Sequence, residues 1–130
     1  MSAIFNFTKL VVADLAKSFA FYRDVCGFTE QQRVRSAIAG RAFEEIIMAG
    51  RSPKAPSLIL LAYDDGRAPS SGEAILGMFT RDLAAFVEQA TRHGGTLAQA
   101  AHHVPDMKFT VAFVRDPEGH LLEVIQQDPQ

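Results

Sequence analysis

Hydrophobic and polar positions follow the same pattern twice along this chain. In the first copy, Phe19, Tyr22 and Val25 fall on one stripe of a 3.6-residue helix, and the second copy repeats this period from Leu83 to Ala90. An apolar run precedes each helical stripe, and three runs rich in β-branched and aromatic residues follow it. The pattern therefore predicts a strand, a helix and three more strands in each half.

Short polar segments separate these predicted elements. The later strands are predicted at about Thr29–Arg35, Arg41–Met48 and Ser57–Tyr63 in the first half, and Thr96–His102, Phe109–Arg115 and His120–Gln126 in the second. Residues 64–72, DDGRAPSSG, are rich in turn formers and predict a linker. We therefore expect an α+β fold of two tandem βαβββ modules in one domain, residues 1–130. Module one covers about 4–63 and module two about 73–127.

The boundaries of the two helices repeat at a constant offset of 68 residues. Asp14 and Asp82 each lie between an apolar run and a helical pattern, where an N-cap residue belongs. Gly27 and Gly95 each lie just past the helix, where a residue with positive φ is favoured. The repeat thus matches residues that begin and end helices.

Composition excludes several classes of function. The formal net charge is −2 and the chain has no basic block, so we expect no nucleic-acid partner. No apolar run approaches the roughly 20 residues that span a bilayer, so we expect no membrane partner. A single cysteine, Cys26, excludes an internal disulfide and is typical of a reducing compartment, which predicts a cytoplasmic location.

Residues 10–15 (LVVADL), followed by Ser18, Phe21-Tyr22 and Gly27-Phe28, and the closing segment 111–123 (VAFVRDPEGHLLE) resemble the vicinal oxygen chelate superfamily. This superfamily includes glyoxalase I, extradiol dioxygenases and bleomycin-resistance proteins. The resemblance covers nearly the whole chain. It implies that the two modules form a curved half-barrel sheet around a cavity, and that the protein is a homodimer.

The resemblance also implies where metal ligands would stand, on four strands. Their positions here are Phe7, Leu60, Ile75 and Glu123, and Phe7 and Ile75 each lie seven residues before a helix-capping Asp. Phe, Leu and Ile have no lone pair to donate to a metal. We therefore expect no cofactor, with a metal possible only at a nonstandard site that uses His102 or His103 with Glu123.

Glu123 is the main candidate for chemistry. Strand alternation places it on the same face as Leu121 and Ile125, and a carboxylate on an apolar face either reaches water or faces a site. It could act as a base or as a polar anchor for a ligand. His102 and His103 are expected in a loop after the sixth predicted strand, where either could face a cavity.

Three functions remain open at this point. The first is a small-molecule-binding or metal-independent protein of the glyoxalase/bleomycin-resistance type, with an apolar or aromatic ligand in the half-barrel cavity. Its expected ligand-binding residues are Phe7, Leu60, Ile75, Glu123, His102 and His103. The second is a metal-dependent lyase/isomerase or dioxygenase with a nonstandard metal site. The third is a structural module, whose cavity would be filled by its own side chains.

Overall fold

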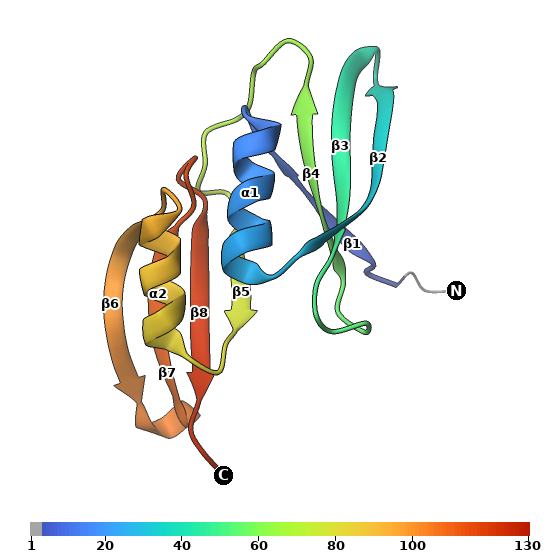
Figure 1. The fold of residues 1–130 in the computed structure, drawn as a ribbon. Coiled ribbons are helices and arrows are strands. Elements are labelled where there is room, and N and C mark those ends of the chain that lie inside the picture. The colour runs from blue at the N-terminus through green and yellow to red at the C-terminus, as the bar shows by residue number, and fades with distance from the viewer. Residues whose placement is uncertain (1–3) are drawn as a thin grey trace. The chain divides into compact units, whose positions relative to one another are not determined.

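The two predicted modules are present in the structure, a computed structural model that describes residues 4–130 (Figure 1). Module one contains β1 (Phe7–Val11), α1 (Leu15–Cys26), β2 (Thr29–Ile38), β3 (Arg41–Ala49) and β4 (Ser57–Tyr63). Module two contains β5 (Ile75–Phe79), α2 (Leu83–Arg92), β6 (Thr96–Val104), the 3₁₀ turn η1 (Pro105–Met107), β7 (Phe109–Arg115) and β8 (Leu121–Gln127). The α+β fold of two tandem βαβββ modules is therefore confirmed. Compact units meet between Pro69 and Ser70, within the predicted linker, while the single domain and the shared half-barrel stay predictions.

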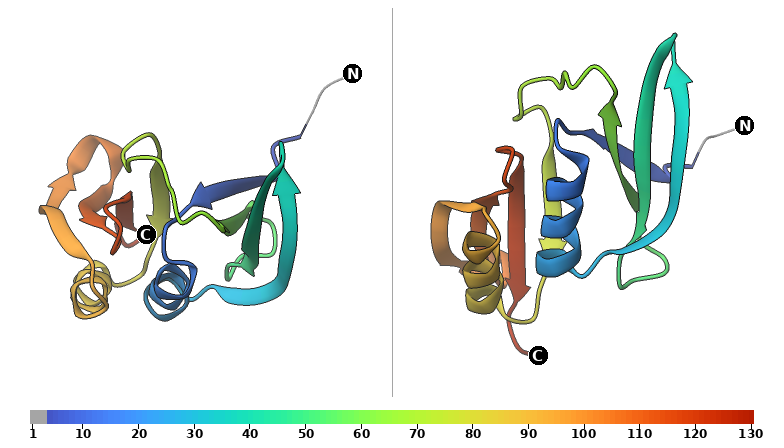
Figure 2. Two further views of the ribbon diagram at one scale, coloured as in Figure 1. Left: turned by 90° about the horizontal axis from the view of Figure 1, so that it is seen from above. Right: turned by 45° about the horizontal axis from the view of Figure 1, so that its top comes forward.

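Each module is a four-stranded mixed sheet with one helix against one face (Figure 2). The strand order is β1-β4-β3-β2 in module one and β5-β8-β7-β6 in module two. The first strand of each module pairs in parallel with the last, and the other pairs are antiparallel. The first and last strands of a module are thus neighbours, although a helix and two strands separate them in sequence.

Capping residues explain where the helices begin. The Asp14 side chain accepts a hydrogen bond from the Lys17 backbone N–H at 3.0 Å, and Asp82 accepts one from Ala85 at 3.0 Å. These bonds satisfy donors that lack partners inside the helix. After α1, Gly27 has the predicted left-handed conformation (φ 77°). In module two the prediction was one residue late, since Gly94 has positive φ in place of Gly95.

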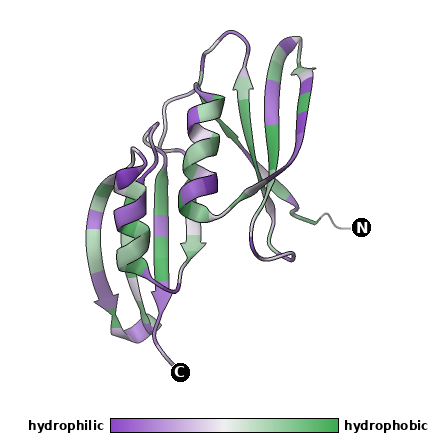
Figure 3. Ribbon diagram, in the orientation of Figure 1, coloured by the Kyte–Doolittle hydropathy of each residue, from purple (hydrophilic) through white to green (hydrophobic). Residues whose placement is uncertain are grey.

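The core of each module lies between its helix and one face of its sheet, which we call the helix face. In module one, the fully buried side chains include Ile46, Met48 and Leu60 of the sheet and Phe21 and Tyr22 of α1. In module two they are Ala112, Val114, Leu122 and Val124. Figure 3 shows this pattern as continuous hydrophobic colour along β4, whereas hydrophilic residues interrupt β2.

The last strand of module two is tied to its helix by one polar contact. The Gln126 side-chain Oε1 accepts a hydrogen bond from the Leu83 backbone N–H, at 2.7 Å, at the start of α2. Since Leu122, Val124 and Gln126 alternate on one side of β8, this bond identifies that side as the helix face. Glu123 therefore lies on the other side.

Two boundaries differ from the sequence prediction. Strand β6 continues to Val104, so His102 and His103 lie within a strand, and their expected position in a surface loop was wrong. Strand β2 continues to Ile38, three residues beyond the predicted end. Within residues 4–130 there is no helix of the length and hydropathy needed to cross a membrane.

We predict that Asp82→Ala lowers the free energy of unfolding by about 1 kcal/mol, because the Ala85 N–H loses its acceptor. Urea unfolding followed by circular dichroism measures this change. Asp82→Asn is the matched control, since Asn caps helices as well as Asp does. Equal losses in both variants would show that the cap is not the cause.

Candidate functional site

The candidate site in module two is built on the face of the sheet away from α2, which we call the far face. The parallel pairing of β5 and β8 sets Gly77 beside Glu123 and Phe79 beside Ile125. Neighbouring residues in register point their side chains to the same side of a sheet, so Glu123 shares this face with Ile75 and Phe79. Ile75 is 58% exposed and Phe79 is 78% exposed.

Glu123 is a half-buried carboxylate between a glycine and an aromatic residue. Gly77 stands beside it on β5, and Phe113 stands beside it on β7. Among residues 4–130 the Glu123 side chain has no hydrogen bond and no ion pair. A half-buried carboxylate in this position retains its full capacity to accept hydrogen bonds from a ligand.

Gly77 leaves open space beside this carboxylate. A Cβ atom added at Gly77 would meet no atom within 4 Å, and the backbone there does not have the positive φ that favours glycine. Glycine is also unfavourable within a strand, because it has no side chain to pack. The fold of module two therefore does not require glycine at this position.

The two candidate histidines lie on opposite faces of module two. His102 is paired with Val111 on the far face, and its Nδ1 lies 3.2 Å from the Gln99 side-chain nitrogen. His103 is paired with Thr110 on the helix side, and its Nε2 lies 3.0 Å from the Asp128 carboxylate. The structure thus brings only His102 onto the face of Glu123. Two strand spacings separate β6 from β8, about 10 Å.

In module one, the structure does not bring Leu60 together with Phe7. The register pairs Leu60 with Leu10, and Lys9 with Ile59. Leu60 is fully buried on the helix face, whereas Phe7 lies on the far face and is 48% exposed. The far-face residue of β4 is therefore Ile59, one position before the predicted Leu60, and it is equally unable to donate a lone pair to a metal.

An ion pair that the sequence reasoning missed occupies the far face of module one. Lys9 Nζ lies 2.9 Å from Glu45 Oε2, and the Glu45 side chain is only 7% exposed. Glu45 Oε2 accepts no hydrogen bond of good geometry, so the contact is mainly ionic. Lys9 Nζ also lies 5.5 Å from the ring centre of Phe43 and 5.8 Å from that of Phe7. These rings add a cation–π contribution.

Lys9 and Gly77 stand at equivalent positions, since each lies 68 residues apart in the repeat and each faces the central residue of the last strand. In module one, the position holds a lysine that covers a buried carboxylate. In module two, it holds no side chain and leaves Glu123 uncovered. The same fold therefore has a closed far face in one module and an open carboxylate in the other.

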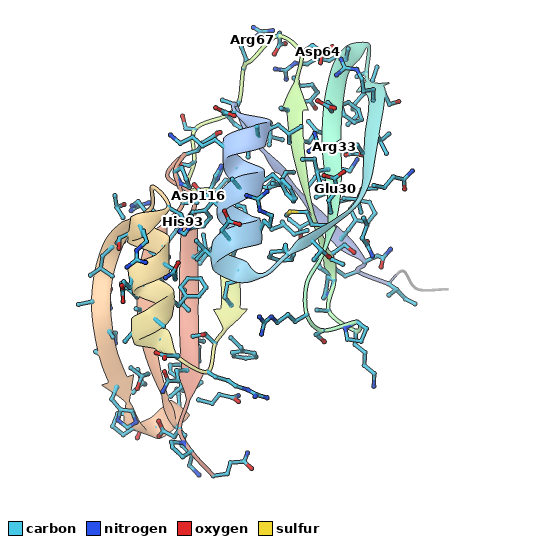
Figure 4. All side chains as sticks on the ribbon, in the orientation of Figure 1. Glu30, Arg33, Asp64, Arg67, His93 and Asp116 are labelled. Atoms are coloured by element: carbon cyan, nitrogen blue, oxygen red, sulfur yellow. The ribbon has the colours of Figure 1, made fainter. Side chains whose placement is uncertain are left out.

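A second polar cluster follows the end of β4, at the loop where Figure 4 labels Asp64 and Arg67. Arg41 donates two hydrogen bonds to the Asp65 carboxylate, at 2.7 and 2.8 Å, and its guanidinium carbon lies 3.7 Å from the ring centre of Tyr63. Asp65 also accepts from the Arg67 backbone N–H at 2.9 Å. Arg41 and then the Arg67 N–H hold the pKa of Asp65 well below its ordinary value.

With this geometry described, comparison with known proteins gives the family. Residues 4–124 match the model of the Glyoxalase/Bleomycin resistance protein/Dioxygenase superfamily, so the chain belongs to that superfamily. The lactoylglutathione lyase of Haemophilus influenzae is 28% identical over 92% of this chain and 89% of its own length. The lactoylglutathione lyase of Salmonella typhimurium is 27% identical over 92% and 89%.

Solved structures show the same fold at lower identity. A glyoxalase family protein from Bacillus cereus has a TM-score of 0.82 and 13% identity, with 95% of this chain and 93% of that chain covered. The E144Q mutant of glyoxalase I from Zea mays has a TM-score of 0.74 and 17% identity. That match covers 95% of this chain but 46% of the maize chain, so our chain spans about half the length of the maize protein.

These relatives contradict the expectation that the protein has no cofactor, because lactoylglutathione lyases and glyoxalase I enzymes are typically metal-dependent. Of the four positions that the resemblance implied, only Glu123 carries a metal-binding atom. Residues 4–130 also contain no cluster of three or more His, Cys, Asp or Glu suited to a metal. The side chains present do not fit the family's metal at these positions, and we assign no reaction step to a metal.

We predict that Lys9→Met lowers the free energy of unfolding by about 2 kcal/mol, because it leaves the Glu45 carboxylate buried without its cation. Lys9→Met with Glu45→Leu should recover most of this loss, since the buried charge is then gone. A double-mutant cycle by urea unfolding measures the coupling. A double variant as unstable as the sum of the single variants would contradict the pairing.

The Asp65 carboxyl should titrate below its ordinary pKa of 3.8 in the folded protein. Because the folded pKa is depressed, the stabilising contribution of the Arg41 contact is complete above pH 3.8 and is lost as pH falls through the folded pKa. Carboxyl ¹³C chemical shifts follow this titration. Arg41→Gln should raise the pKa more than Arg67→Gln, which keeps its backbone N–H. A pKa of Asp65 at or above 3.8 would contradict the account.

Proposed function

We propose that this protein binds a small molecule with an apolar or aromatic body on the far face of module two, and that Glu123 is its polar anchor. The observation that carries the proposal is the uncovered, half-buried Glu123 carboxylate beside Gly77. Exposed Ile75 and Phe79 on the same face supply apolar surface for the ligand body. A few polar groups among apolar residues are typical of ligand sites.

Glu123 anchors the ligand by accepting a hydrogen bond from a hydroxyl or an amine. Phe113 and Ile125 stand next to it in the sheet and exclude part of the surrounding water. A hydrogen bond to a charged acceptor is stronger than one between neutral groups, and it fixes the orientation of the ligand. In a substrate with an acidic C–H, the same carboxylate is placed to act as a base.

Among the predicted ligand-binding residues, Ile75 and His102 share the far face with Glu123. Phe7 lies on the far face of module one, and its part in binding remains a proposal that depends on the half-barrel. Leu60 and His103 belong to the helix side of their sheets, so we replace Leu60 by Ile59 in the proposed set.

A second candidate is a lyase reaction like that of lactoylglutathione lyase. It is favoured by the curated relatives, which are 27–28% identical over about nine tenths of both chains. The assay runs in the direction of lactoylglutathione formation, with and without added divalent metal. Turnover that Glu123→Gln abolishes would establish this candidate in place of simple binding.

The predicted homodimer and the cytoplasmic location are also proposals. Large exposed apolar side chains on or next to the edge strands support the dimer; they are Phe5, Phe7, Ile75 and Phe79. Light scattering during size-exclusion chromatography gives the mass directly. A mass of one chain, 14.2 kDa, at micromolar concentration would contradict the dimer.

We predict that benzyl alcohol, a neutral aromatic molecule with one hydroxyl donor, shifts the backbone amide signals of β5 and β8 in ¹H–¹⁵N NMR spectra. Glu123→Gln should weaken this binding about tenfold, because the charged acceptor is lost. Glu73→Gln, which removes an exposed carboxylate elsewhere in module two, is the matched control. Benzyl methyl ether has no hydroxyl hydrogen and should bind the parent protein as weakly as benzyl alcohol binds Glu123→Gln.

Gly77→Val tests the open space independently of charge. Valine is favoured in strands and its Cβ meets no atom, so the fold should keep its stability while binding falls at least about tenfold. Gly77→Lys should have the same effect, because it gives module two the lysine that module one has at Lys9. Unchanged affinity in both variants, with both folded, would refute the proposed site.

A further inference from the structure

The cavity at the end of β4 lies outside the site proposed above. It has a volume of about 510 Å³, within the range of small-molecule sites, and it is lined by Val11, Arg41, Tyr63, Arg67, Ala68 and Pro69. All these residues belong to module one and the linker that follows it. Two guanidinium groups and a tyrosine ring therefore line the same cavity as three small apolar side chains.

The charges around this cavity do not cancel. Arg41 and Arg67 both contact the carboxylate of Asp65, Arg67 through Nη2 at 3.3 Å, so two cations share one anion. The neighbouring Asp64 is engaged by Arg35 at 2.8 Å. The cluster of Arg41, Asp65 and Arg67 thus has a formal charge of +1, and the low pKa of Asp65 is consistent with a positive local potential.

The two arginines keep hydrogen-bond donors for a ligand. Arg41 uses Nε and Nη2 for Asp65 and for the Arg67 carbonyl, and no contact is recorded for its Nη1 within residues 4–130. It is held in place by the carboxylate on one edge and by Tyr63 against its face. Arg67 uses Nη2 alone among its side-chain nitrogens, and its side chain is 80% exposed. A fixed guanidinium binds an oxyanion with little loss of conformational entropy.

We infer that this cavity is a binding site for a small carboxylate with an aromatic or short aliphatic body. The oxyanion lies against Arg67 and the Nη1 edge of Arg41, and the apolar body lies against Val11, Ala68 and Pro69. Arginine suits this task because its planar donors match a carboxylate. The site goes beyond the proposed function, since it uses neither Glu123 nor any other residue of module two.

Benzoate and benzamide are the test probes, because they have the same ring and differ in charge. In ¹H–¹⁵N NMR titrations at low salt, benzoate should shift the amide signals of Tyr63, Arg67 and Ala68 and bind at least tenfold more tightly than benzamide. Its affinity should fall as salt is added, as expected for an exposed charged contact. Equal affinity for benzamide would overturn the inference.

Arg67→Gln should weaken benzoate binding about tenfold, and Arg81→Gln, which removes an exposed arginine in module two, should not change it. Inorganic phosphate should bind more weakly than benzoate, because it does not use the apolar lining; equal affinity would overturn the claim of a carboxylate with an apolar body. Arg67→Gln should leave benzyl alcohol binding unchanged, so failure at this cavity and failure at Glu123 are told apart. Benzoate shifts confined to other segments would also overturn the inference.

Discussion

The parallel register between the first and last strand of each module determines which side chains can meet. Pairing Lys9 with Ile59 and Gly77 with Glu123 fixes one face of each sheet for the helix and leaves the other for polar groups. Because side chains alternate along a strand, a shift of one residue would exchange the two faces completely. The buried helix-face residues make such a shift costly. Every contact discussed on the far faces therefore depends on this pairing.

The two modules use the same register for different purposes. In module one, Lys9 and the buried Glu45 neutralise each other under the rings of Phe7 and Phe43. In module two, glycine replaces the lysine and Glu123 has no partner among residues 4–130. Duplicated modules can diverge in this way without loss of the fold, because far-face residues contribute little to the helix-face core. The open carboxylate is what makes module two the better candidate for ligand binding.

Sequence patterns predicted the elements well, because caps and periodicity are local. Asp14, Gly27 and Asp82 could be located from their positions beside apolar runs. Leu60 was misplaced because the repeat aligns the first strand and helix of each module at a constant offset of 68, whereas Ile59 and Glu123 are 64 residues apart. The difference lies in the hairpins between them, and the sequence contains no signal for which face each residue takes. The Lys9–Glu45 pair was missed because it joins β1 to β3, across β4, and requires knowledge of the strand order.

The expectation of no cofactor failed for a related reason. It was inferred from side chains at four positions, but the family relationship is the stronger guide to cofactors, and its lactoylglutathione lyases are typically metal-dependent. The chemistry at Glu123 does not depend on that outcome, because it rests on an unpaired carboxylate beside open space. This distinction separates what the residues of this chain do from what the family does.

The central claim is that the space beside Gly77 receives a ligand held by Glu123. A crystal structure of the protein soaked with a library of neutral aromatic alcohols and amines tests it most directly. We predict ligand density over Gly77 with a hydroxyl or amine within about 3 Å of a Glu123 carboxylate oxygen. A structure in which the protein's own side chains fill this space, with ligands bound only elsewhere, would contradict the account.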